Sequence, residues 1–186
     1  MNTTMSVKET TPLASRIFAS DKSAFQQNFN KNPFQFSHNL HGNPLFELPR
    51  LQKLANRILD EHRETKGVLW QNHDAPVDAK WSDVPKKMQM DKLGEAIANL
   101  DKSGSWVLLY SVQSDPEYNA LLNQIINEVE DMVGAFKKEI SIQDAYIFLA
   151  SPQSVTPYHI DHETTFLFQV QGNRTANIWD RSIVPE

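Results

Sequence analysis

The chain has 186 residues and a formal net charge of −5, from 18 basic and 23 acidic side chains, a size that suits one domain with a sizeable core. It contains no cysteine, which excludes disulfides, thiolate zinc sites, iron–sulfur clusters and a cysteine nucleophile. The acidic balance and the lack of a basic block argue against a nucleic-acid partner, because phosphate binding needs clustered lysine and arginine.

The sequence has no feature of a membrane or secreted protein. No apolar run approaches the roughly 20 residues that cross a bilayer, and the first residues lack the apolar stretch of a secretory signal. The absence of cysteine also agrees with a reducing compartment. We therefore expect a cytoplasmic protein with no membrane partner.

The first part of the chain predicts a flexible tail, an irregular arm and then a helix. Residues 1–23 are rich in Thr, Ser and Lys without periodic apolar positions, which is typical of a loose tail. Residues 24–47 are rich in Phe, but two Asn-Pro steps disfavour a helix, so we expect an ordered, non-repetitive arm over the core. Leucines at three- and four-residue spacing then predict an amphipathic helix over 49–63.

The region 24–139 as a whole is predicted to be mixed α/β. Residues 66–71 favour a short strand, and residues 105–112 favour a buried strand because they are apolar, β-branched and aromatic. Between these two segments, a weaker helix that stops near Gly104 is indicated by the spacing of Leu93, Ile97 and Leu100.

The clearest helix of the sequence is predicted over 115–137. Ser114 and Glu117 have the spacing of a capping box, and Pro116 falls in the first turn. The apolar positions form a continuous stripe, so we interpret this segment as a packing helix that carries no chemistry.

From residue 140 the pattern changes to strands with short links. The apolar and alternating runs predict three strands, over 140–150, 165–171 and 174–180. Ser151-Pro152 predicts a turn, and Gly172-Asn173 predicts a two-residue hairpin loop with Gly where a type II′ turn needs it. The predicted fold class is therefore α+β, with N-terminal helices and short strands followed by an antiparallel run over 140–186.

His159 and Asp161 are the first candidates for chemistry. Residues two apart on a strand face the same way, so their imidazole and carboxylate would lie side by side. These groups are two of the three ligands in the facial triad that leaves open positions on non-haem Fe(II). The alternative interpretation is an exposed polar pair on an edge strand, because a His-x-Asp pattern alone is common.

The surroundings of this pair carry a family resemblance. The pattern Thr-Pro-x-His-x-Asp over 156–161 is followed, on the next predicted strand, by Thr165, Phe166, Gln169, Gly172 and Arg174. Over about residues 141–181 the chain thereby resembles the JmjC-type and asparaginyl-hydroxylase-like branch of the 2-oxoglutarate oxygenases. Trp179-Asp180 also matches bacterial cupin-like proteins of the jumonji type, and residues 32–54 are similar to the segment that leads into their domain.

The resemblance implies a double-stranded β-helix, the cupin or jelly-roll fold, that begins within 140–186. It also implies Fe(II) held by His159 and Asp161, with 2-oxoglutarate as the cosubstrate. Arg174 stands where the family places a basic residue on the distal carboxylate of 2-oxoglutarate, a task that suits the planar guanidinium. A surface charge at the end of a hairpin is the alternative for this arginine. The further cosubstrate contacts that the resemblance implies are Thr156, Thr165 and Tyr146.

The resemblance also implies parts that this sequence lacks. The third ligand of the family is a histidine on a later strand, but no histidine follows His162. A jelly-roll needs about eight strands, and only its first few are predicted here. We therefore expect the chain to be an N-terminal fragment of a longer protein or to be completed by a partner chain, and to be inactive alone.

Two further functions stay open beside an oxygenase that hydroxylates a protein side chain or a small molecule. A non-catalytic cupin-like module could bind a ligand or serve regulation, because one fold hosts both enzymes and binders. A metal-dependent cupin could run another chemistry such as isomerisation, although Thr156 and Arg174 favour 2-oxoglutarate. The substrate and the oligomeric state are open, and a homodimer is one expectation because such proteins often pair through helices outside the barrel.

The remaining aromatic and histidine side chains are interpreted as structural. We expect core positions for Phe166, Phe168 and Val170, and packing roles for Trp70, Trp81 and Trp106. We expect no metal ligand among His38, His41, His62, His73 and His162.

Overall fold

The computed structural model describes residues 16–61, 68–71, 97–103, 106–152, 154–156 and 159–178. Several expectations lie outside the described residues: those for His62, His73, Trp81, Gly104, Pro157 and Trp179-Asp180, and that for the side chain of Trp70. Among the described residues no helix is long and apolar enough to cross a membrane.

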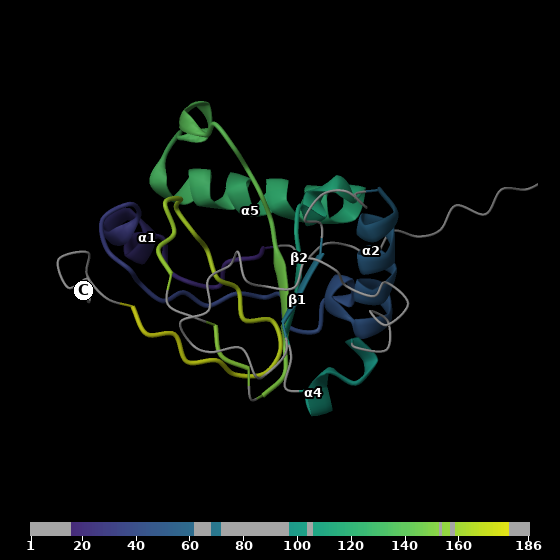
Figure 1. Cartoon of the computed structure of the whole chain (residues 1–186). Helices are drawn as coiled ribbons and strands as arrows, with labels where there is room; N and C mark the ends of the chain where they lie inside the picture. Colours follow the sequence, from purple (N-terminus) through teal and green to yellow (C-terminus); the bar gives the residue numbers. More distant parts are fainter. Residues whose placement is uncertain are drawn as a thin grey trace, which may run out of the picture.

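An antiparallel sheet lies at the centre of the described structure (Figure 1). Its strands, in the order β1-β2-β3, are β1 (Val68–Gln71), β2 (Trp106–Leu109) and β3 (Ile147–Ala150). The register places Leu69, Leu108 and Phe148 on one rung. The strands predicted over 66–71 and 105–112 are confirmed, whereas only the end of the strand predicted over 140–150 is paired.

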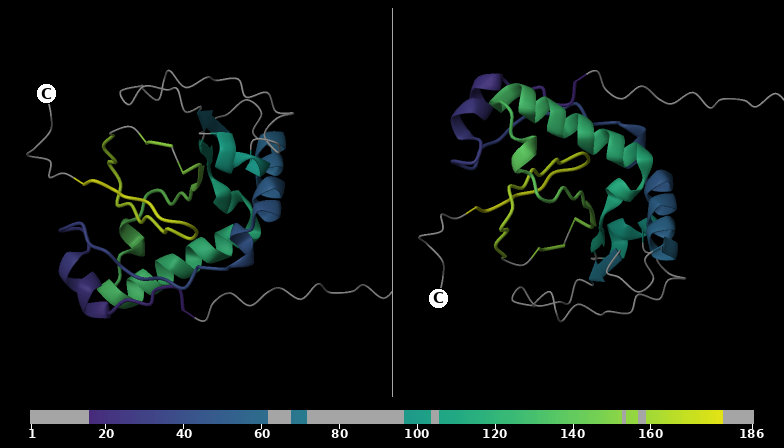
Figure 2. Two further views of the ribbon diagram at one scale, coloured as in Figure 1. Left: turned by 90° about the horizontal axis from the view of Figure 1, so that it is seen from below. Right: turned by 90° about the horizontal axis from the view of Figure 1, so that it is seen from above.

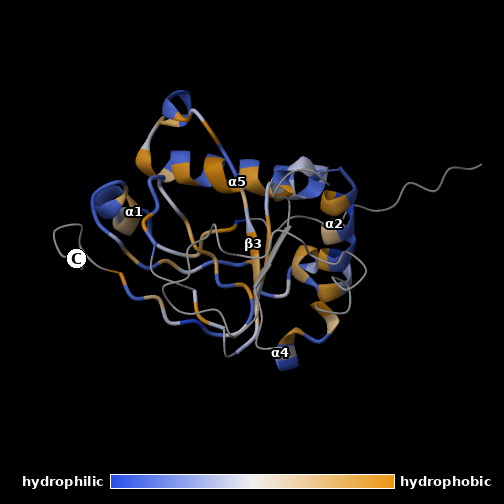
Figure 3. Ribbon diagram, in the orientation of Figure 1, coloured by the Kyte–Doolittle hydropathy of each residue, from blue (hydrophilic) through white to orange (hydrophobic). Residues whose placement is uncertain are grey.

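Helices α2 (Leu48–Glu61) and α5 (Pro116–Val133) confirm the two helices that the apolar periodicity predicts most clearly. Figure 3 shows hydrophobic and hydrophilic bands alternating along both, as expected of helices with one buried face. The weaker predicted helix is present as α4 (Leu100–Ser103). Short 3-10 helices η1, η4 and η5 cover Pro44–Phe46, Val112–Ser114 and Lys137–Glu139. The described structure is therefore α+β.

The two faces of the sheet differ in what covers them. Figure 2 shows α2 on one side of the sheet and residues 159–178 on the other, with α5 running from α2 toward α1 (Lys22–Asn28). The α2 side holds the main core, in which α2 and β2 contribute Leu51, Leu54, Ala55, Ile58, Val107 and Leu109. Because side chains alternate along a strand, the opposite side carries Trp106, Leu108 and Phe148.

The segment just before and within α1 corrects the expected extent of the tail. Ile17 and Phe18 are fully buried, and α1 begins at Lys22 with the Asp21 side chain as its N-cap. Residues 16–23 are therefore ordered, because two of their apolar side chains are buried in the core. The local sequence pattern does not predict this burial. Helix α1 also corrects the expectation of an arm without a helix over 24–47, because the Asn-Pro step at Asn32-Pro33 lies beyond the end of the helix and does not restrict it.

The strands predicted over 165–171 and 174–180 are wrong for the residues that the structure describes there. Neither 165–171 nor 174–178 takes part in a strand ladder. Gly172 does have a φ of +70°, the sign that the predicted turn requires at this position. Phe166, Phe168 and Val170 are packed against the core as expected, so burial alone explains the alternating pattern. A jelly-roll is accordingly not seen among the described residues.

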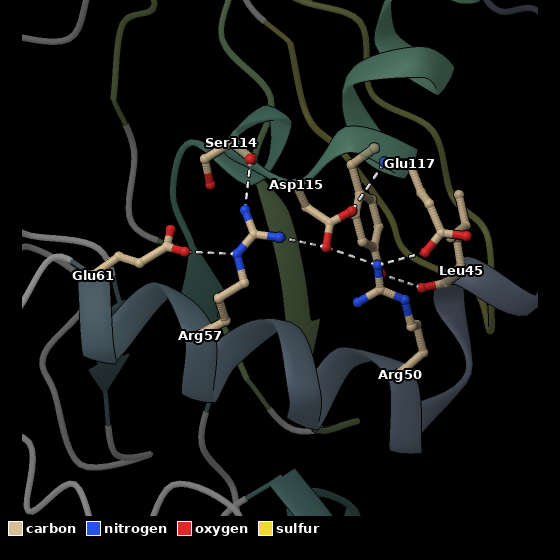
Figure 4. A network of polar contacts seen from close by, with 8 residues as sticks. Leu45, Arg50, Arg57, Glu61, Ser114, Asp115 and Glu117 are labelled. Atoms are coloured by element: carbon tan, nitrogen blue, oxygen red, sulfur yellow. Dashed lines mark hydrogen bonds and ion pairs between the residues drawn. The ribbon is translucent and has the colours of Figure 1, made fainter. Parts of the chain in front are cut away.

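The start of α5 also differs from the prediction. Asp115, not Ser114, is the N-cap, and its carboxylate accepts from the backbone N–H of Glu117. Figure 4 shows the same carboxylate between two guanidinium groups of α2: Oδ2 lies 2.8 Å from Nη2 of Arg50 and 3.0 Å from Nη1 of Arg57. Asp115 therefore caps α5 and, through the same carboxylate, joins α5 to α2.

A second carboxylate, that of Glu128 on α5, holds the N-terminal segment. Its oxygens accept from the backbone N–H of Ile17 at 2.8 and 2.9 Å and from that of Phe18 at 3.0 Å. Carboxylates that accept from backbone N–H groups form the stronger class of hydrogen bond. This contact bridges more than a hundred residues of sequence and fixes two fully buried side chains.

The substitution Glu128→Gln is expected to lower the free energy of unfolding by about 1–3 kcal/mol, because one oxygen acceptor becomes an amide donor that faces backbone N–H groups. Urea denaturation measures this change. The matched control is Asp131→Asn, an exposed position on the same helix, which should stay within about 0.5 kcal/mol of the wild type. Equal values for the two variants would contradict the role of Glu128.

The brace at Asp115 predicts a loss of stability in acid. Burial raises the pKa of this carboxyl, but the hydrogen bond from Arg50 and the N–H of Glu117 lower it more, so the net pKa lies below its ordinary 3.8. A carboxyl with a lowered pKa stabilises the fold above its unfolded pKa, and this stabilisation is lost as the pH falls through the folded pKa.

Asp115→Asn should therefore flatten the acid limb of the stability curve. At neutral pH we expect the variant to be less stable than the wild type by at least about 1 kcal/mol, because the contacts with Arg50 and Arg57 lose their carboxylate charge while asparagine still caps the helix. On further acidification the variant should lose less stability than the wild type loses. Thermal unfolding followed from about pH 6 to about pH 2 measures both slopes. Parallel slopes would contradict the assignment.

Candidate functional site

His159 and Asp161 lie beside each other, although the segment that carries them is not a strand. Nε2 of His159 is 3.5 Å from Oδ1 of Asp161, and the two side chains are 40% and 48% exposed. Two ligands about 2.1 Å from one metal ion and at right angles are about 3 Å apart. The distance between the two atoms is therefore close to that of neighbouring ligands, and a small side-chain rotation would shorten it to that value.

Thr165 lies next to the aspartate of this pair. Its Oγ1 lies 3.4 Å from Oδ2 of Asp161, the oxygen other than the one that faces His159. A hydroxyl in this place acts on a ligand from outside, as the outer contacts of metal ligands do. The structure thus brings together three of the predicted site residues: His159, Asp161 and Thr165.

Arg174 and Thr156 form the second pair of predicted residues that the structure brings together. The guanidinium donates to Oγ1 of Thr156, and its Cζ lies 5.8 Å from the centre of the Phe148 ring. No carboxylate pairs with Arg174 within the described part of the chain. An exposed cation above an aromatic ring, with a hydroxyl beside it, is suited to a carboxylate ligand.

Tyr146, the remaining predicted cosubstrate contact, lies in a separate set of contacts. Its hydroxyl donates to Oδ2 of Asp144 at 3.0 Å, and its ring stands edge-on to that of Tyr110 at 5.0 Å. Asp144 is itself held by Nε2 of Gln113 at 2.6 Å. Tyr146 is therefore tied at the end of β3, and no direct contact joins it to Arg174 or Thr156 in the described residues.

The pKa of Tyr146 reflects this tie. Burial of the phenol raises it first, and the hydrogen bond to the Asp144 carboxylate adds to the effect, giving a pKa of about 12. Tyr146 is nevertheless 53% exposed, so much of its side chain remains accessible while its hydroxyl donates to Asp144.

The structure places aromatic side chains beside Tyr146 and Phe148 that the sequence analysis did not assign to the site, among them Trp106, which is buried as expected of a packing residue. Tyr110 contacts Tyr146, and Trp106 contacts Phe148 at 5.3 Å between ring centres. The sequence predicts only that the strand over 105–112 is buried. In the structure, every second residue of this strand faces the same side as Arg174. The strand register, which depends on pairing between β2 and β3, is the signal that groups these rings.

The other histidines of the described chain do not join this pair. His162 is exposed beside the pair, and its backbone N–H donates to the Glu163 carboxylate. His38 and His41 each contact a backbone carbonyl of the segment 165–171. Across the described ranges no group of three or more His, Cys, Asp or Glu side chains is placed to hold a metal ion.

Comparisons with known proteins add no relative. No family model matches the chain, and neither a curated protein nor a solved structure matches it. The functional interpretation therefore rests on the site residues and on the sequence resemblance.

The tie between Tyr146 and Asp144 can be tested by titration. Asp144→Asn removes the negative charge that disfavours tyrosinate, so the pKa of Tyr146 should fall from about 12 toward its ordinary 10.0. The ultraviolet absorbance of tyrosinate measures the shift, and Tyr146→Phe identifies which titration step belongs to this residue. An unchanged step in Asp144→Asn would show that the carboxylate does not set this pKa.

Proposed function

We propose that this chain carries part of the site of a cupin-like, JmjC-type Fe(II)/2-oxoglutarate-dependent oxygenase that hydroxylates a protein side chain or a small molecule. The observation that carries the proposal is the 3.5 Å approach of His159 Nε2 to Asp161 Oδ1. The contact of Arg174 with Thr156, two further residues of the same motif, supports it.

The donor set fits a ferrous ion as far as it goes. An imidazole nitrogen and a carboxylate oxygen are the ligand types of the facial triad, and both side chains here are exposed. Thr165 would hold the aspartate in the orientation that points Oδ1 at the metal. No third ligand lies with them in the described residues, so the proposal needs one from outside these residues, together with the remaining strands of a jelly-roll.

Arg174 would bind the distal carboxylate of 2-oxoglutarate. Its planar guanidinium can donate two parallel hydrogen bonds, and the hydroxyl of Thr156 beside it can donate a third. The Phe148 ring lies 5.8 Å from the guanidinium carbon, within the range of a cation–π contact. When bound, the iron and 2-oxoglutarate supply the oxygen-activating chemistry, and these residues supply position.

Metal binding tests the first half of the proposal. Mn(II), which resists oxidation, is titrated against the protein and followed by electron paramagnetic resonance. We expect His159→Ala and Asp161→Ala each to weaken binding at least about tenfold, since even outer contacts of metal sites contribute that much. The matched control is His162→Ala, an exposed neighbour that should leave the affinity unchanged.

The outcome that would overturn the metal site is equal Mn(II) affinity in all three variants and the wild type. Loss of binding in His162→Ala alone would equally reject the pair and assign the metal to another histidine.

Cosubstrate binding tests the second half. Arg174→Gln should weaken binding of 2-oxoglutarate about ten- to a hundredfold, because charged hydrogen bonds to a carboxylate are lost. Isothermal titration in the presence of Mn(II) measures this change, with Lys138→Gln as a control that removes an exposed positive charge from η5. If both variants bind 2-oxoglutarate like the wild type, Arg174 is a surface charge and this half of the proposal fails.

A non-catalytic, carboxylate-binding module is the second candidate function. It is favoured by one observation, that Arg174 and Thr156 are assembled while only two metal ligands are together in the described residues. Binding of 2-oxoglutarate that depends on Arg174 but not on Mn(II), His159 or Asp161 would support this module over the oxygenase.

A further inference from the structure

The segment 164–171 is held in place by an unusual set of contacts. It takes part in no strand ladder, yet it connects the metal-ligand pair to the turn before Arg174. Within the described residues, its long-range hydrogen bonds all go to the arm between residues 30 and 46. The arm supplies Asn30 to Thr164, His38 to Gln169, His41 to Val170, and the Phe46 carbonyl to Gln171.

His38 is the best defined of these contacts because its tautomer is fixed by geometry. The backbone N–H of Leu40 donates to Nδ1 at 3.2 Å, so Nδ1 must carry the lone pair. The proton of the neutral ring is therefore on Nε2, which lies 3.2 Å from the carbonyl oxygen of Gln169 and donates to it. One imidazole thus joins a local turn of the arm to the segment that bears the site.

Ring packing lies behind this hydrogen bond. The His38 ring stands edge-on to Phe168 at 5.4 Å, and Phe168 contacts Phe18 at 5.5 Å and Phe36 at 5.1 Å. The backbone of His38 is bridged to that of Phe18. Ring packing holds the segment against the core. The hydrogen bond from His38 is directional, so it determines which residue of the segment lies opposite His38.

We propose that His38 is a positioning residue for the candidate site, with His41 in a supporting role. By donating to Gln169, His38 sets where Thr165 meets Asp161 on one side and where Gly172 turns toward Arg174 on the other. The docking of segment 164–171 stands on its own geometry, while its effect on a metal rests on the function proposed above.

Two amide substitutions separate the local contact from the long-range one. Asn carries its polar atoms at the reach of Nδ1, so His38→Asn can still accept from Leu40 but does not reach Gln169. Gln carries its NH₂ at the reach of Nε2, so His38→Gln can still donate to the Gln169 carbonyl. His38→Ala removes both contacts.

The position of the segment is read from a nitroxide label. The chain has no cysteine, so Leu167→Cys, at a side chain that is 59% exposed, gives a single attachment point inside the segment. The mobile fraction of the label spectrum reports undocking of the segment, independently of any metal. Mn(II) affinity, measured on the same variants without the label, reports the effect on the site.

The expected result separates the variants into two groups. His38→Ala and His38→Asn should raise the mobile fraction about fivefold and weaken Mn(II) binding by a similar factor, the effect of one ordinary hydrogen bond. His38→Gln should remain within about twofold of the wild type in both measurements.

Three results would overturn the proposal. A label that is as immobile in His38→Ala as in the wild type would show that packing alone docks the segment. Wild-type behaviour of His38→Asn would assign His38 a purely local role. Loss of Mn(II) affinity in His38→Gln with an immobile label would make His38 a metal ligand instead of a positioning residue.

Failure of the proposed function is distinguishable from these results. If the wild type binds no Mn(II) while the label series follows the expected order, the metal site is rejected and His38 is supported as the residue that docks the segment.

Discussion

The capture of two backbone N–H groups by Glu128 is the contact on which the rest of the described structure depends. It ties the segment around Ile17 and Phe18 to α5, and both side chains are fully buried. Phe18 then stands at the middle of the aromatic cluster, with ring contacts to Phe25, Phe36, Phe166 and Phe168. The anchor thereby fixes the backbone beside the central ring of the cluster, against which the arm packs.

The segment 164–171 of the candidate site is held by this arm and pairs with no strand, although Arg174 beyond it lies over Phe148 of β3. The segment 164–171 contributes side chains to the aromatic cluster, but its backbone is held by side chains of the arm. A segment fixed by a few side-chain bonds opens at lower free energy than one fixed by a strand ladder. The site-bearing segment is therefore the part of the described fold whose position responds most to single substitutions, while α2, α5 and the sheet stay as they are.

Local patterns in the sequence predict the elements that local physics determines. The apolar periodicity of α2 and α5 and the apolar run of β2 are sufficient, because each element buries one continuous surface. The alternation over 165–171 misleads because packing on Phe18 and Phe36 gives the same period as a ladder partner would. The Glu128 contact and the bond from His38 to Gln169 join residues more than a hundred positions apart, so no window of sequence contains them.

The same distinction applies to the site itself. The closeness of His159 and Asp161 is a local property: residues two apart lie near each other here even without a strand. The meeting of Arg174 with Thr156 above Phe148 is not local, since it needs β3, the segment after it and the turn at Gly172 to be placed together. Arg174 is exposed and has no carboxylate partner in the described residues, so its remaining N–H donors are available to an anion. That availability is the physical argument for proposing a carboxylate ligand there, in either of the two proposed functions.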